Sequence, residues 1–195
     1  MAKLSQEAWE FGMLLFDQFI YTSRMEEAQK KEIIQEADEL GAKRAEEIRG
    51  IYKTGGAEGI LKQLGVVIIR ENERRGQERF VRFAEFYPKN KKICLNGAVL
   101  DRLGKKMDKK LAREIILCHE LYHYFEVFSW GKTSRCFRRK VRLFGKIPVT
   151  REILPAAEIA ANAFCRTLLR LEFEPQMIEQ LYWEKERMEN GGDAE

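Results

Sequence analysis

The stretch of sequence that decides the fold is DKKLAREIILCHELYHYFEVF, at residues 108–128. Apolar residues recur in it every three or four positions, which predicts an amphipathic helix over this whole range. The stripe expected to be buried consists of Leu111, Ile115, Cys118, Tyr122 and Phe125. The same helix contains both histidines of the chain, four residues apart in the sequence HELYH at 119–123.

HELYH has the pattern of a zinc-peptidase motif. Residues i and i+4 share one face of a helix, so His119 and His123 can both reach one tetrahedral ion. Glu120 is offset from that line and can take a proton from a metal-bound water, whose pKa zinc lowers. The pattern arises by chance in about one of a thousand such chains. These residues predict one zinc ion (Zn²⁺) per chain, with Glu120 as the general base.

A catalytic zinc needs a third protein ligand, and with both histidines used we look for a carboxylate. Glu126 is on the same helix but a turn further along, too far to close a compact site. Glu152 precedes Pro155, where no helix is expected yet. Glu158 lies well inside the helix that Pro155 opens, with Asn162 one turn later. This spacing suits Glu158 as the ligand and Asn162 as acceptor of a histidine's other N–H, with Glu152 as the alternative ligand.

The rest of the chain predicts an α+β fold that is mainly helical. Helices are expected over residues 5–52, 57–64, 155–171 and 176–188. The first of these ranges should contain two or three helices, with breaks near 21–24 and at Gly41. Strand-like runs lie at 66–70, 79–87 and 92–95. Because turns separate these runs, we expect a small three-stranded antiparallel sheet, with the strands in chain order.

Composition predicts a globular protein of a reducing compartment. The 195 residues are 45% hydrophobic, and the four cysteines occur singly, as expected of free thiols in the cytosol. No apolar run approaches the ~20 residues that span a bilayer, and no signal peptide is visible. We therefore expect a cytoplasmic protein without a membrane partner. Its predicted parts are a helical region packed on the core (1–54), the main domain (55–190) and a disordered tail (191–195).

Charge alone does not indicate a nucleic-acid partner. Lys and Arg number 35 against 31 Asp and Glu, a net charge of +4, and no recognised DNA-reading motif is present. Direct nucleic-acid binding is thus not expected, although one segment is strongly basic. Residues 129–151 contain eight Lys or Arg and no acid. We interpret this segment as a long loop that docks an acidic face of a protein through Arg138, Arg139 and Arg142, with a phosphate backbone or plain solvent as alternatives.

Taken together, KICLN at 92–96, HELYH at 119–123 and Glu158-x-x-Ala161-Asn162-Ala163-Phe164 resemble the ImmA/IrrE-type metallopeptidases. The resemblance covers about residues 57–170. It implies a zincin-like fold, and cleavage of a protein such as a helix-turn-helix transcriptional repressor. It also implies His119, His123 and Glu158 as zinc ligands, Glu120 as general base and Asn162 as a supporting group. The chain departs from the family pattern at two positions. The family usually has a small residue where this chain has Tyr122, and often has Glu where it has Ala160.

The resemblance also suggests where substrate would bind. In zincins the edge strand before the HExxH helix commonly pairs with extended substrate, a place that residues 91–96 would occupy here. Cys94 and Leu95 of that strand, together with Tyr122 beside the metal, are the expected substrate contacts.

The sequence therefore favours a zinc endopeptidase that acts on a specific protein. One rival is a catalytically silent zinc-binding protein that regulates by contact with protein or DNA. Another is a DNA-binding protein with a structural zinc. Glu120 favours the enzyme, because a purely structural site has no need of a general base.

Overall fold

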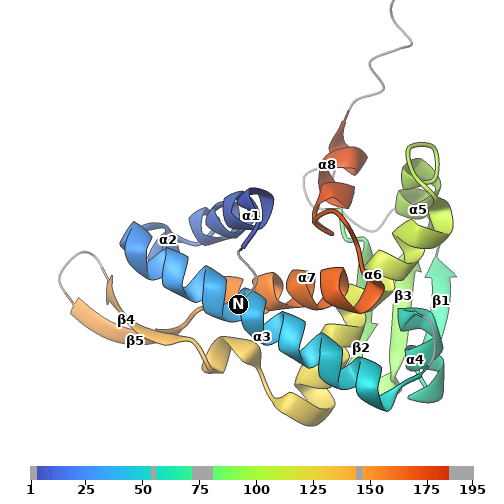
Figure 1. Ribbon diagram of the computed structural model, residues 1–195, viewed down its shortest axis with the longest axis horizontal. Coiled ribbons are helices and arrows are strands. Elements are labelled where there is room, and N and C mark those ends of the chain that lie inside the picture. The colour runs from blue at the N-terminus through green and yellow to red at the C-terminus, as the bar shows by residue number, and fades with distance from the viewer. Residues whose placement is uncertain (1–3, 54–55, 72–80, 144–146, 185–195) are drawn as a thin grey trace, which may run out of the picture.

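A three-stranded sheet and a β-hairpin lie at opposite ends of the molecule, with helices between them (Figure 1). The computed structural model describes residues 4–53, 56–71, 81–143 and 147–184. The sheet contains β1 (Val67–Glu71), β2 (Ala84–Tyr87) and β3 (Lys92–Asn96), and the hairpin contains β4 (Arg138–Leu143) and β5 (Ile147–Glu152). The predicted α+β class with mainly helical content is confirmed.

The sheet is mixed, so the predicted antiparallel meander is wrong. Its strand order is β1-β3-β2, with β3 parallel to β1 and antiparallel to β2. A short helical turn, η1 (Pro88–Asn90), joins β2 to β3 tightly and ends at Lys91 in the left-handed conformation, with φ 44°. Twelve residues of sequence separate the end of β1 from the start of β2, too many for a tight turn between neighbouring strands. The predicted edge strand is therefore the middle strand.

The N-terminal region forms α1 (Gln6–Asp17), α2 (Ile20–Ser23) and α3 (Glu27–Ile51). The Ser5 hydroxyl caps α1 by accepting a hydrogen bond from the Ala8 N–H at 3.0 Å. The chain breaks at Arg24, between α2 and α3, as predicted. The predicted break at Gly41 is wrong, because α3 runs through it. An added Cβ there would lie 2.1 Å from the carbonyl oxygen of Ala160, so this glycine allows α3 to pack closely on α7 (Pro155–Leu169).

The central helix α6 (Lys109–Phe125) forms where the sequence predicts it. The side chain of Asp108 caps its start by accepting from the Leu111 N–H at 2.7 Å. The α-helix ends earlier than predicted. It continues as a wider π-helical turn, η2 (Glu126–Trp130), which stops at Gly131 with φ 76°. This wider turn redirects the chain right after the two histidines.

Shorter helices flank the sheet and the site. They are α4 (Ala57–Gln63), α5 (Gly97–Leu103) and α8 (Met177–Trp183). The helix α5 is not among the predicted elements, although Asn96 caps it by accepting from the N–H groups of Ala98 and Val99. No described helix is both long and apolar enough to cross a membrane. The predicted end of the last helix and the predicted tail, 185–195, lie outside the described residues.

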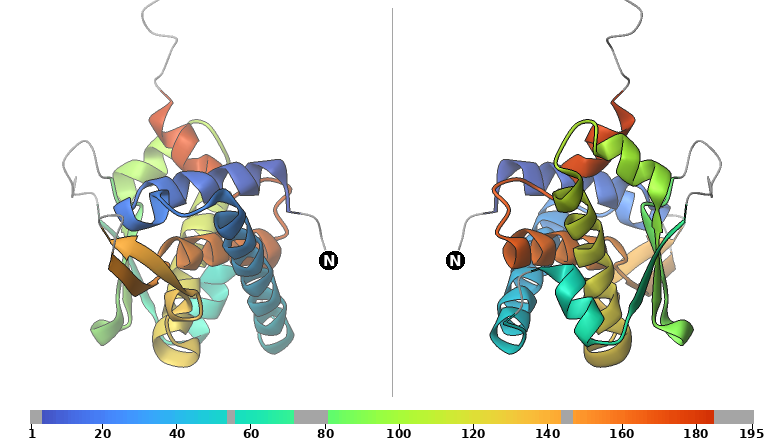
Figure 2. Two further views of the ribbon diagram at one scale, coloured as in Figure 1. Left: turned by 90° about the vertical axis from the view of Figure 1, so that its left-hand side faces the viewer. Right: turned by 90° about the vertical axis from the view of Figure 1, so that its right-hand side faces the viewer.

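The basic segment is not a long loop. It contains a short turn, η3 (Thr133–Arg135), followed by the β4–β5 hairpin, in which Arg139 lies opposite Arg151. Residues 144–146 lie outside the described part, as does the side chain of Arg142. Arg139 lies 3.5 Å from Glu36 and 3.9 Å from Glu32 of α3, so the hairpin is attached to that helix. It lies at the end of the molecule away from the sheet (Figures 1 and 2).

Candidate metal centre

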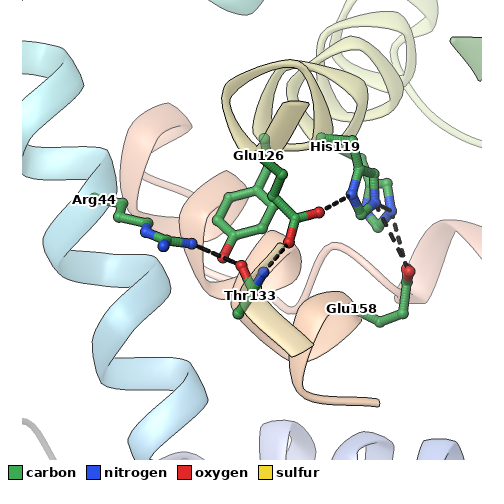
Figure 3. Close-up of polar contacts among 7 residues, drawn as sticks. Arg44, His119, Glu126, Thr133 and Glu158 are labelled. Atoms are coloured by element: carbon green, nitrogen blue, oxygen red, sulfur yellow. Dashed lines mark hydrogen bonds and ion pairs between the residues drawn. The ribbon is translucent and has the colours of Figure 1, made fainter. Parts of the chain in front are cut away.

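Two helices bring the predicted ligands together. His119 and His123 lie one turn apart on α6, while Glu158 lies in the first turn of α7. One nitrogen or oxygen from each of these side chains lies within 4.8 Å of the others. Figure 3 shows Glu158 pointing at the two imidazole rings. The carboxylate brought to the histidines is thus Glu158, whereas Glu152 accepts from the Ser134 hydroxyl at 3.1 Å.

The spacing of these atoms fits a tetrahedral zinc ion. Ligand atoms about 2.0–2.1 Å from such an ion are separated from one another by about 3.3 Å. The Nε2 atoms of His119 and His123 are 3.1 Å apart. One oxygen of Glu158 lies 3.1 Å from the His119 Nε2 and the other lies 3.7 Å from the His123 Nε2. Two imidazoles and one carboxylate are also a donor set that zinc takes at catalytic sites.

Glu126 holds His123 from the side opposite the ligand atom. Its Oε2 lies 2.7 Å from the His123 Nδ1, and its Oε1 accepts the backbone N–H of Thr133 at 2.6 Å. Burial raises the pKa of Glu126, but the hydrogen bonds to His123 and Thr133 outweigh it and the pKa is lowered. An ionised Glu126 accepts a hydrogen bond from the Nδ1–H of His123, which leaves the Nε2 of that ring unprotonated and free for a metal. The sequence reasoning rejected Glu126 as a ligand but missed this role, which its i+3 spacing from His123 could have suggested.

Glu120 lies beside the histidines on the wall of a cavity of about 260 Å³. Burial raises the pKa of its carboxyl group, and His119 and His123 oppose that rise. The other walls come from the residues leading into β2, from α7 and from α8. They include Phe83, Asn162, Ile178 and Trp183. A carboxylate next to an open, partly apolar cavity can exchange a proton with a molecule bound there.

His119 and Glu158 form an ion pair in the metal-free protein. Burial lowers the pKa of His119, but the hydrogen bond and charge of Glu158 outweigh it and raise the pKa to about 10. Burial raises the pKa of Glu158, but His119 outweighs it and lowers the pKa to about 2. A metal ion would replace the proton that the two side chains share.

Other predicted residues lie elsewhere than expected. Asn162 is buried in the cavity wall, and no hydrogen bond joins it to either histidine among the described residues. Tyr122 is fully buried, so it supports the site from within and does not meet substrate. Cys94 and Leu95 lie in the middle strand, whose backbone pairs on both sides. Among the described residues β2 pairs with one strand only, and its first residue, Ala84, lines the cavity; sequence reasoning did not identify this strand as an edge.

The predicted docking arginines are not grouped at the cavity. Arg138 is exposed on β4 and Arg139 faces α3, so neither lines the cavity next to Glu120.

The chain was compared with family models, with curated proteins and with solved structures, and none of them matches it.

Proposed function

We propose that the protein is a zinc-dependent endopeptidase with a zincin-like fold. The observation that carries the proposal is the convergence of His119, His123 and Glu158 at tetrahedral spacing, with Glu120 beside them on an open cavity. The resemblance of the HELYH and Glu158 motifs to ImmA/IrrE-type metallopeptidases supports the same reading. The substrate is a specific protein, and the resemblance favours a helix-turn-helix transcriptional repressor.

In the proposed reaction each residue has a defined task. His119, His123 and Glu158 would hold a zinc ion, whose chemistry there would be to lower the pKa of a water molecule and to polarise the scissile carbonyl. Glu120 accepts the proton of the attacking water and passes it to the leaving amine. Glu126 keeps the Nδ1 of His123 engaged, so that its Nε2 stays directed at the metal.

The substrate backbone would pair with β2. This strand is an edge of the sheet, and residues 81–84 line the cavity together with His119 and Glu120. An extended peptide added to the β2 edge would gain backbone hydrogen bonds and pass the general base.

A single pair of variants tests the activity. Glu120→Gln keeps the size of the side chain but cannot accept the proton, so zinc content should be unchanged while turnover falls by about 10²–10⁴-fold. The matched control is Glu114→Gln on the same helix, whose carboxylate accepts from the Ala57 N–H and lies outside the cavity lining. Cleavage of a peptide library, read by mass spectrometry, should be lost only in Glu120→Gln.

A contrary result would favour the regulatory rival. If zinc-loaded wild type cleaves no peptide and no candidate repressor, while Glu120→Gln retains the full biological effect, the protein acts by contact and not by hydrolysis.

A further inference from the structure

A buried arginine of the N-terminal region lies close to the metal centre. Arg44 of α3 is 8% exposed. One of its nitrogens donates to the Tyr122 hydroxyl at 2.5 Å and to the Thr133 hydroxyl at 2.7 Å. Its guanidinium also lies over the ring of Trp130, 4.5 Å from the centroid. Burying a cation is costly unless its donors are satisfied, so this environment is specific for arginine.

Thr133 connects this arginine to a metal ligand. Its hydroxyl lies 2.7 Å from the Tyr122 hydroxyl, while its backbone N–H donates to Glu126. The other oxygen of Glu126 contacts the Nδ1 of His123. A series of hydrogen bonds through Thr133 and Glu126 therefore connects Arg44 of α3 to the imidazole of His123, as the dashed lines in Figure 3 show.

The geometry points to Arg44 as a positioning residue of the metal site. We propose that it fixes Tyr122 and Thr133, so that the Thr133 N–H keeps Glu126 in place and Glu126 keeps His123 oriented for the metal. The proposal rests on the zinc site of the proposed function and assigns to α3 a role in building that site.

The second ligand helix is held to α3 as well. Gly41 lets α3 approach the backbone of α7 at Ala160, two residues after Glu158. Arg166 of α7 also pairs with Asp38 of α3 at 2.7 Å. Both His123 and Glu158 thus take their positions from the same long helix. Without Arg44, the Thr133 hydroxyl would lose one of its two side-chain contacts and keep only that with the Tyr122 hydroxyl.

The test compares two buried cations of α3. Arg44→Met removes the guanidinium and keeps much of the apolar stem. Lys30→Met removes a cation of the same helix that is 5% exposed and pairs with Asp17 of α1 at 2.9 Å, and so controls for loss of stability. Full-length protein is loaded with zinc against a chromophoric chelator. We expect Arg44→Met to weaken zinc binding by about tenfold, the lower end for groups that support a ligand, and Lys30→Met to leave it unchanged.

A second readout reports the ligand geometry directly. The visible absorption bands of the cobalt(II)-substituted protein should change in Arg44→Met and stay as in wild type in Lys30→Met. Because Arg44→Met could fail to fold, Thr133→Val serves as a second probe, with Thr133→Ser as its matched control. We expect Thr133→Val to weaken zinc binding and Thr133→Ser to restore it, because serine keeps the hydroxyl.

The outcomes separate this inference from the proposed function. Wild type that binds no zinc would overturn both. Wild type that binds zinc, with equal affinity and cobalt spectra in Arg44→Met, Lys30→Met and Thr133→Val, would overturn only the role of Arg44. Absence of peptide cleavage would bear on the proposed function and leave the metal-binding result standing.

Discussion

Replacement of Gly41 by alanine should destabilise the protein and disturb its metal site. The new Cβ would lie 2.1 Å from the carbonyl oxygen of Ala160, more than 1 Å closer than the 3.4 Å of ordinary contact. The clash is between a Cβ fixed to the backbone of α3 and the backbone of α7, so no side chain can move aside and the two helices have to separate. Overpacking of this kind costs up to about 3 kcal/mol. Alanine regains about 1 kcal/mol of helix propensity, so the net loss should be about 2 kcal/mol.

Gly50 provides the matched control on the same helix. An added Cβ there meets no atom within 4 Å, so Gly50→Ala should be neutral or stabilise the protein by up to about 1 kcal/mol. Urea denaturation of metal-free wild type, Gly41→Ala and Gly50→Ala gives the three free energies of unfolding. Since α7 carries Glu158, zinc affinity should also fall in Gly41→Ala alone. A Gly41→Ala variant as stable as Gly50→Ala would refute the close packing of α3 on α7.

Four further predictions concern the site and the hairpin. Glu126→Gln should weaken zinc binding by about 10–100-fold, measured by chelator competition, because a neutral amide holds His123 less firmly. The ion pair of His119 and Glu158 should stabilise the metal-free protein fully between about pH 4.5 and 6.5, and this stabilisation should be lost as pH rises through about 10 or falls towards about 2; unfolding measured across that range checks it. Near pH 8 zinc binding should release about one proton, seen by calorimetry in buffers of different ionisation enthalpy. If an acidic protein docks on the exposed Arg138 and Lys140 of the hairpin, reversing both to Glu should slow cleavage, as added salt does, without changing zinc content.

The parts of the fold that depend on local sequence were predictable. The helix that carries the histidines follows from apolar spacing, and Asp108 caps it one residue before its start. The i, i+4 spacing of His119 and His123 fixes their common face whatever surrounds the helix. Glu158 follows from the need for a third ligand and from its place after Pro155.

The parts of the fold that depend on contacts between residues far apart in the chain were not predictable from the sequence. The order of β1, β3 and β2 is set by pairing between strands, to which turn residues contribute little. Gly41 looks like a helix break in sequence, and only the approach of Ala160 explains why a glycine lies inside α3. Arg44 is far along the chain from Tyr122 and Thr133, so no spacing rule connects it to the site.

The most direct test of the metal centre is the zinc content of wild type and Glu158→Ala, each purified without chelator and measured by mass spectrometry of the metal. The geometry of His119, His123 and Glu158 predicts about one zinc per wild-type chain and a large loss in the variant, because two histidines alone rarely hold zinc. Equal zinc content in both proteins would show that the third ligand is a residue other than Glu158. Wild type that contains no zinc would contradict the metal centre itself.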